Sequence, residues 1–99
     1  MRLTERQIHI IKEEVAQVFG PYASVWLFGS RTDDTAKGGD IDIMVEAAMS
    51  PDDALEKELK LYARLIRRLG DRRIDIIVHR ADAPMLAVHQ AAVTTGVRL

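Results

Sequence analysis

Residues 25–42 read VWLFGSRTDDTAKGGDID, and this stretch contains most of the residues on which the prediction of fold and function depends. An apolar run ends at Gly29-Ser30, and a polar, glycine-rich connection then leads to Asp40-Ile41-Asp42. A Gly-Ser turn at the end of a strand can bring backbone N–H groups and a hydroxyl against a phosphate. Two Asp at alternate strand positions share a face, roughly 7 Å apart, and Mg²⁺ is typically held by one or two carboxylates plus substrate phosphates. The stretch therefore predicts nucleotidyl or phosphoryl transfer.

Length and composition set the limits of this hypothesis. The 99 residues, with a net charge of −1, predict one domain over residues 1–99 and give no overall charge that would gather nucleic acid. The absence of cysteine excludes disulfides and thiolate metal sites. No apolar run has the length of a membrane span and no signal-peptide pattern is present, so we expect no membrane contact and take the cytoplasm as the default location.

Periodicity and capping signals predict an α/β (α+β) domain with a small mixed sheet of three or more strands flanked by helices. Thr4 and Gln7 form a capping-box pattern, Ser50-Pro51 is a strong helix start, and Asp82 is the expected cap of the last helix. The predicted helices cover residues 4–19, 51–69 and 83–95, and the predicted strands cover residues 24–28, 40–46 and 73–78.

The middle helix carries an apolar stripe that we expect to be buried, formed by Leu55, Leu59, Tyr62, Ile66 and Leu69. Three arginines near its end, at positions 64, 67 and 68, are explained by the favourable interaction of cations with the helix dipole. A role for one of them in binding a nucleotide or a partner is an alternative.

A third acidic residue interrupts the last apolar strand. If the unit from residue 40 to residue 78 is a parallel β-α-β crossover, both strands begin at the same edge of the sheet, and Asp75 stands beside Asp42. A metal ion shared with Asp40 and Asp42 would remove the cost of an unpaired carboxylate. The alternative is a surface Asp or a salt bridge to Arg73 or a helix Arg. His79, on the Asp75 face, is expected to be a surface residue rather than a catalyst.

With these residues in place, the chain resembles a known family. Gly29-Ser30, nine further residues, Asp40-x-Asp42 and a later strand Asp75 resemble the DNA polymerase β-like nucleotidyltransferase superfamily. The short length resembles its minimal nucleotidyltransferase (MNT) group, and the resemblance extends from the first helix to Val78.

The resemblance implies a site and a reaction. Asp40 and Asp42 would hold two Mg²⁺ ions and Asp75 would complete the metal site and orient or deprotonate an acceptor hydroxyl. The phosphates of a nucleoside triphosphate would rest on Gly29 and Ser30, with Arg31 assisting. The hydroxyl would attack the α-phosphorus and pyrophosphate would leave.

The resemblance also implies a partner. MNT proteins are similar to the antitoxins of HEPN-domain ribonuclease toxins, so this chain would transfer AMP from ATP to a tyrosine of such a toxin and silence it. In a chain of this length we expect no second domain that would hold a tRNA, a DNA duplex or an aminoglycoside, which favours a protein substrate or a stable partner. Two alternatives stay open: an antitoxin that neutralises by binding alone, and a nucleotidyltransferase acting on a small molecule such as an antibiotic.

Overall fold

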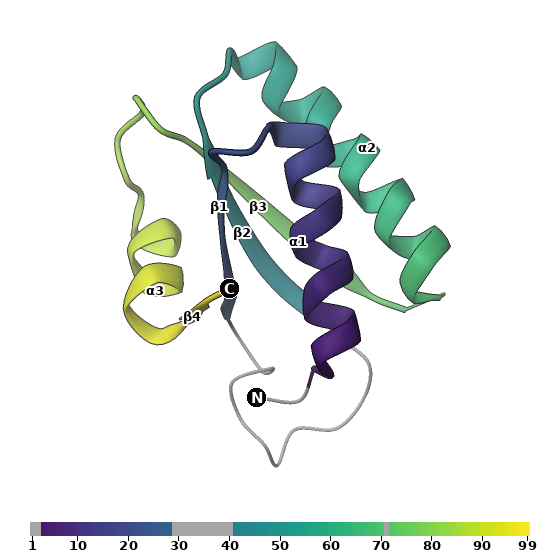
Figure 1. The fold of residues 1–99 in the computed structure, drawn as a ribbon. Helices are drawn as coiled ribbons and strands as arrows, with labels where there is room; N and C mark the ends of the chain where they lie inside the picture. Colours follow the sequence, from purple (N-terminus) through teal and green to yellow (C-terminus); the bar gives the residue numbers. More distant parts are fainter. Residues whose placement is uncertain (1–2, 29–40, 71) are drawn as a thin grey trace.

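The computed structural model describes residues 3–28, 41–70 and 72–99, which form a mixed sheet with helices on both faces (Figure 1). The sheet has the order β3-β2-β1-β4; β1 pairs antiparallel with β2 and with β4, and β2 pairs parallel with β3. Within the described ranges no helix is long and apolar enough to cross a membrane. The elements are α1 (Glu5–Phe19), β1 (Ser24–Phe28), β2 (Ile41–Ala47), α2 (Pro51–Leu69), β3 (Ile74–Arg80), α3 (Ala87–Thr95) and β4 (Val97–Arg98).

The first two helices begin where their capping signals predict. Thr4 accepts a hydrogen bond from the Gln7 backbone N–H, and the Gln7 side chain accepts one from the Thr4 N–H, so the capping box is complete. The Ser50 side chain accepts from the Asp53 N–H, and Pro51 occupies the first helical position. These local contacts satisfy amide groups that a helix start otherwise leaves without partners.

The core lies between one face of the sheet and the pair α1 and α2. Alternate residues of β1 and β2, together with Ile74 of β3, project into it, so one face of each strand is buried under the two helices. The fully buried side chains of this core are Ile10, Ile11, Leu27, Ile41, Ile43, Val45, Leu61 and Leu65. The opposite sheet face carries Asp42 and Asp75, and α3 packs against part of it, over β1 (Figure 1).

The predicted buried stripe of α2 is wrong at three of its five positions. The helix instead buries Leu61, Leu65 and Leu69, while Leu55 and Leu59 are each 61% exposed and Tyr62 is 43% exposed. Both sets recur at helical spacing, and the packing of α2 beside α1 determines which one faces the core. Leu59 and Tyr62 of the exposed set line a groove between α2 and the edge strand β3.

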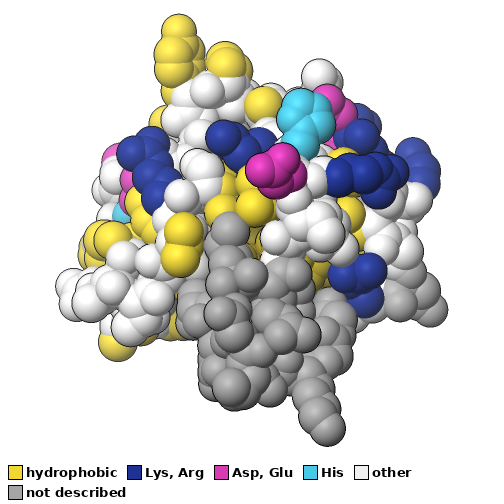
Figure 2. Space-filling model, turned by 60° about the horizontal axis from the view of Figure 1, so that its bottom comes forward, with side chains coloured by type: hydrophobic (Ala, Val, Ile, Leu, Met, Phe, Trp, Pro, Cys, Tyr) yellow, Lys and Arg dark blue, Asp and Glu magenta, His cyan; other side chains and the backbone are white. Residues whose placement is uncertain are grey.

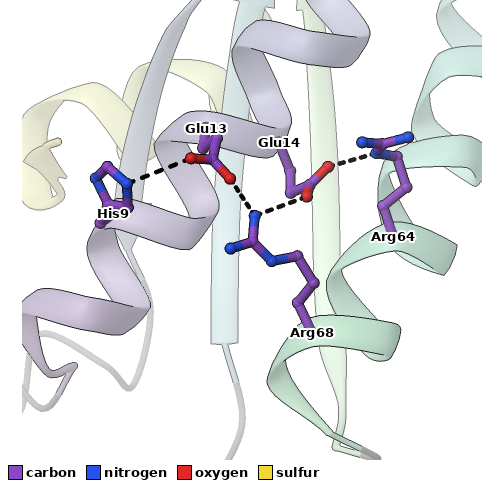
Figure 3. Close-up of polar contacts among 5 residues, drawn as sticks. All are labelled: His9, Glu13, Glu14, Arg64 and Arg68. Atoms are coloured by element: carbon purple, nitrogen blue, oxygen red, sulfur yellow. Dashed lines mark hydrogen bonds and ion pairs between the residues drawn. The ribbon is translucent and has the colours of Figure 1, made fainter.

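Charged side chains join the two helices that cover the core (Figure 3). Glu14 of α1 is only 4% exposed; it accepts hydrogen bonds from Arg64 Nε and from Arg68 Nη1, the latter at 2.9 Å. Arg68 also bonds to Glu13, which forms a second ion pair with His9. Burial alone would raise the pKa of Glu14, but the two arginines outweigh that cost and lower it. The helix-dipole explanation of these arginines was therefore incomplete.

The C-terminal region differs from its predicted form. The last helix begins at Ala87 rather than Ala83, and Asp82 is not its cap. Gly96 follows the helix with an extended backbone, and a Cβ there would lie 2.3 Å from the Ala92 carbonyl oxygen and 2.7 Å from that of Leu27. Only glycine tolerates this approach, and the chain then forms the short strand β4, which the sequence analysis did not predict.

Candidate functional site

Two of the predicted acidic residues lie side by side in the sheet. Asp42, the second residue of β2, and Asp75, the second residue of β3, are register partners in the parallel pair. Neighbouring strands are about 4.8 Å apart, and side chains at register positions project from the same face. Since Ile41, Ile43 and Ile74 enter the core on one face, both carboxylates belong to the other. The parallel crossover predicted from the sequence is therefore present and joins these two strands.

The surroundings of Asp75 keep its carboxylate accessible. Its side chain is 49% exposed, and Arg73 Nε lies 3.3 Å from its Oδ2. This ion pair is the alternative that the sequence analysis left open. Because the Arg73 side chain is 71% exposed, the pair is weak in water and can open when another cation approaches. The contact with Arg73 therefore does not prevent Asp75 from binding a metal ion.

The remaining predicted site residues fall on a stretch that the structure does not describe. Gly29, Ser30, Arg31 and Asp40 lie outside the described residues, so their roles stay predictions. The nearest described neighbour is Phe28, the last residue of β1, which is the register partner of Asp42 in the antiparallel pair. The strand that leads into Gly29-Ser30 therefore ends directly beside the strand that carries Asp42.

The donor chemistry fits a hard divalent cation. Across the described ranges no group of three His, Cys, Asp or Glu side chains is placed to hold a metal. Two carboxylates on adjacent strands nevertheless match the way Mg²⁺ binds in phosphate chemistry, with one or two protein carboxylates and the remaining positions taken by phosphates and water. Asp42 and Asp75 are the described residues that would hold such an ion.

Positively charged side chains gather at the end of the molecule where α2 ends and β3 begins. Arg67 and Arg68 belong to the last turn of α2, and Arg72 and Arg73 directly precede β3. Figure 2 shows several Lys and Arg side chains on this end. Of these arginines, Arg73 contacts Asp75 directly, whereas Arg68 is paired with Glu13 and Glu14 of α1.

Sequence reasoning was wrong about His79, which is buried at 3% exposure. Its Nδ1 lies 2.7 Å from Glu46 Oε2, its Nε2 donates to the Ala83 carbonyl oxygen at 2.9 Å, and its ring centroid is 4.7 Å from that of His89 on α3. The sequence signal that could have found this cluster is the alternation of β2 and β3, which places Glu46 and His79 at register positions on one face.

This histidine cluster is a structural contact and not a part of the acidic site. His79 is four residues beyond Asp75 on the same strand, roughly 13 Å along the sheet. Burial is the main cause that lowers the pKa of His89, and the electrostatic effect of the nearby His79 ring lowers this pKa further. A neutral His89 can accept the Leu86 backbone N–H at Nδ1, a 3.1 Å contact at the start of α3. The cluster therefore attaches α3 to the sheet.

An α+β domain with a mixed sheet carries two acidic residues side by side at the start of two parallel strands, an arrangement that suits the chemistry of phosphates and a divalent cation. The family model for polymerase β nucleotidyltransferases matches residues 9–99, and the chain belongs to this nucleotidyltransferase family. A comparison with curated proteins finds no match. The membership confirms the predicted fold and the general activity, and it implies a nucleoside triphosphate substrate and, as usual for such enzymes, a divalent metal ion.

Proposed function

We propose that this protein is a Mg²⁺-dependent nucleotidyltransferase that transfers AMP from ATP to a hydroxyl of a partner protein. The acceptor in this proposal is a tyrosine of a HEPN-domain ribonuclease toxin, which the transfer silences, so that the chain acts as an antitoxin. The observation that carries the catalytic part is the register pairing of Asp42 with Asp75 on one face of the sheet, in a chain of the nucleotidyltransferase family.

Each acidic residue has a distinct role in this proposal. Asp42, together with Asp40, would hold the divalent cations, which would supply positive charge against the triphosphate and the leaving pyrophosphate. Asp75 completes the metal site and accepts the proton of the attacking hydroxyl. The acceptor oxygen then forms a bond to the α-phosphorus while the bond from that phosphorus to the pyrophosphate oxygen breaks. Gly29, Ser30 and Arg31 hold the phosphates.

A macromolecular acceptor is consistent with the surroundings of Asp75. The carboxylate is half exposed on β3, which is an edge strand of the sheet, so a hydroxyl carried on a bulky partner can approach it. The protein supplies positioning, because aligning the hydroxyl with the α-phosphorus removes much of the entropic barrier of a two-substrate reaction.

The test is a transfer assay with the product of the adjacent gene, ATP and Mg²⁺, read by intact-protein mass spectrometry. We expect the added mass of AMP on the partner, and we expect Asp42→Asn and Asp75→Asn each to lower the rate by about 100-fold or more. Asp82→Asn is the matched control, because its carboxylate is 80% exposed and, among the described residues, forms an ion pair with Arg80 at 4.0 Å. Unchanged transfer by Asp42→Asn would remove the metal-site assignment.

The same variant separates enzymatic from purely physical neutralisation. If catalysis silences the toxin, Asp42→Asn binds the partner but fails to protect cells that express it. Protection equal to that of the parent chain would instead support an antitoxin that acts by binding alone. Transfer of AMP to an aminoglycoside in the absence of any partner protein would support the small-molecule alternative.

A further inference from the structure

One flank of α2 has the composition of a buried surface but lies exposed. Leu55, Leu59 and Tyr62 follow one another at helical spacing and are 61%, 61% and 43% exposed. Single exposed apolar residues are normal on a protein surface, but a contiguous stripe marks a contact surface. Below, the flank of α2 formed by these three residues is called the α2 stripe.

The α2 stripe adjoins a second unpartnered feature, the outer edge of β3. A groove of about 490 Å³ runs between them, lined on the helix side by Glu58, Leu59 and Tyr62 and on the strand side by residues 74–77. The strand is seven residues long and ends the sheet order, so its outer backbone groups have no strand partner within the described sheet. It contains no proline or lysine, the residues that commonly protect an edge from pairing with another chain.

The charges beside the stripe differ between its two ends. The exposed acidic residues Asp52, Asp53 and Glu56 lie in the first two turns of α2. At the other end, Arg67 is exposed in the last turn, and Arg72 and Arg73 follow before β3 begins. A surface with opposite charges at its two ends is complementary to itself when it is rotated by half a turn.

We infer that a second copy of this chain docks on the α2 stripe and the edge of β3, related to the first by a two-fold axis. In such a dimer each α2 lies antiparallel to its counterpart, which sets the apolar stripes against each other and brings the acidic start of one helix to the basic end of the other. The two β3 edges lie antiparallel across the axis and can continue the sheet from one copy into the next. A second copy carries the same apolar stripe with the charges in reversed order, so it matches both features at once.

Asp75 lines the strand side of the groove, so the proposed contact borders the acidic site. Asp42 and Asp75 belong to the sheet face opposite α1 and α2, whereas the apolar stripe lies on the α2 side of the sheet. The dimer is tested by the mass of the particle in solution and the proposed function by the transfer of AMP, so the failure of one is distinguished from the failure of the other.

The first test is the mass of the purified chain in solution, measured by light scattering after size exclusion over a range of concentrations. We expect a particle of twice the 11.1 kDa chain mass. Leu59→Glu should weaken dimerisation by at least about 100-fold, because the axis repeats the substitution in both copies at the centre of the contact. Val88→Glu on α3 is the matched control: Val88 is 45% exposed and lies outside the groove, so the dimer should persist.

A second test examines the charge complementarity directly. In the proposed dimer, Glu56→Lys places two positive charges, and Arg67→Glu two negative charges, where position 56 of one copy meets position 67 of the other, so each variant alone should dimerise more weakly than the parent chain. A mixture of the two should recover the dimer, read by native mass spectrometry as a species that contains one copy of each. Circular dichroism confirms that the variants are folded. A parent chain that stays monomeric at every concentration, or a mixture that forms no mixed dimer, would overturn the inference.

Discussion

Replacing Glu14 by Gln should destabilise the protein more than any other single charge removal on α1. The Glu14 side chain is 5% exposed and accepts hydrogen bonds from both Arg64 and Arg68. A charge-assisted hydrogen bond contributes about 1.5–3 kcal/mol to stability. Since both arginines are roughly one-third exposed and can turn to water after the change, we discount the sum of the two bonds and expect a loss of about 2 kcal/mol.

Urea unfolding followed by circular dichroism measures this loss. The urea concentration at the unfolding midpoint should fall. The dependence of the unfolding free energy on urea concentration should stay that of the parent chain, because the surface exposed on unfolding does not change. The corresponding fall in melting temperature is about 8–16 °C for a domain of this size. The matched control is Glu13→Gln, whose carboxylate shares Arg68 but is exposed at the surface, and its midpoint should stay close to that of the parent.

The pH dependence gives the same reasoning a second test. The folded protein lowers the pKa of Glu14 below its ordinary value of 4.5. The stabilisation is therefore fully present above about pH 4.5 and is lost as the pH falls through the lower, folded-state pKa. In Glu14→Gln this part of the acid sensitivity should disappear. A midpoint for Glu14→Gln equal to that of Glu13→Gln would refute the account of the helix contact.

Three further predictions concern the local contacts of the fold. The pKa of His89 lies below its ordinary value of 6.5, so as the pH falls the unfolded chain takes up a proton before the folded protein does. The stability of the fold should therefore decrease as the pH drops below about 6.5. His89→Gln keeps an acceptor for the Leu86 N–H and should reduce this decrease, measured as urea midpoints on either side of that pH. Gly96→Ala should cost about 1–3 kcal/mol, because its Cβ would collide with two backbone carbonyls, and an unchanged melting temperature would contradict the close approach. Ser50→Ala should cost about 1 kcal/mol through loss of the α2 cap, whereas Ser50→Asp, which keeps an acceptor, should retain most of the parent's thermal stability.

The sequence was most informative where the signal is local. The capping box of α1 and the Ser50-Pro51 start of α2 predicted where these helices begin, and β1 has the predicted bounds, because these features depend on residues within a few positions of each other. The pairing of Asp42 with Asp75 could also be predicted, because a parallel crossover leaves little freedom in where the two strands begin.

Features that depend on distant contacts could not be predicted in the same way. α2 carries two apolar stripes, and only the position of α1 determines that Leu61 and Leu65 face the core while Leu55 and Leu59 do not. His79 looked like a surface residue because its partners, Glu46 and His89, belong to other elements. The start of α3 shifted from Ala83 to Ala87, and Ala83 instead accepts the His79 side chain at its carbonyl oxygen.

The most direct test of the central claim is the binding of Mn²⁺, with a non-hydrolysable ATP analogue, to the purified chain, followed by electron paramagnetic resonance. If the carboxylates of Asp42 and Asp75 together hold the cation, Asp42→Asn and Asp75→Asn should each weaken binding by at least about tenfold. Asp82→Asn should bind as the parent chain does. Parent-like Mn²⁺ affinity in both Asp42→Asn and Asp75→Asn would contradict the account, whatever the outcome of the transfer assay.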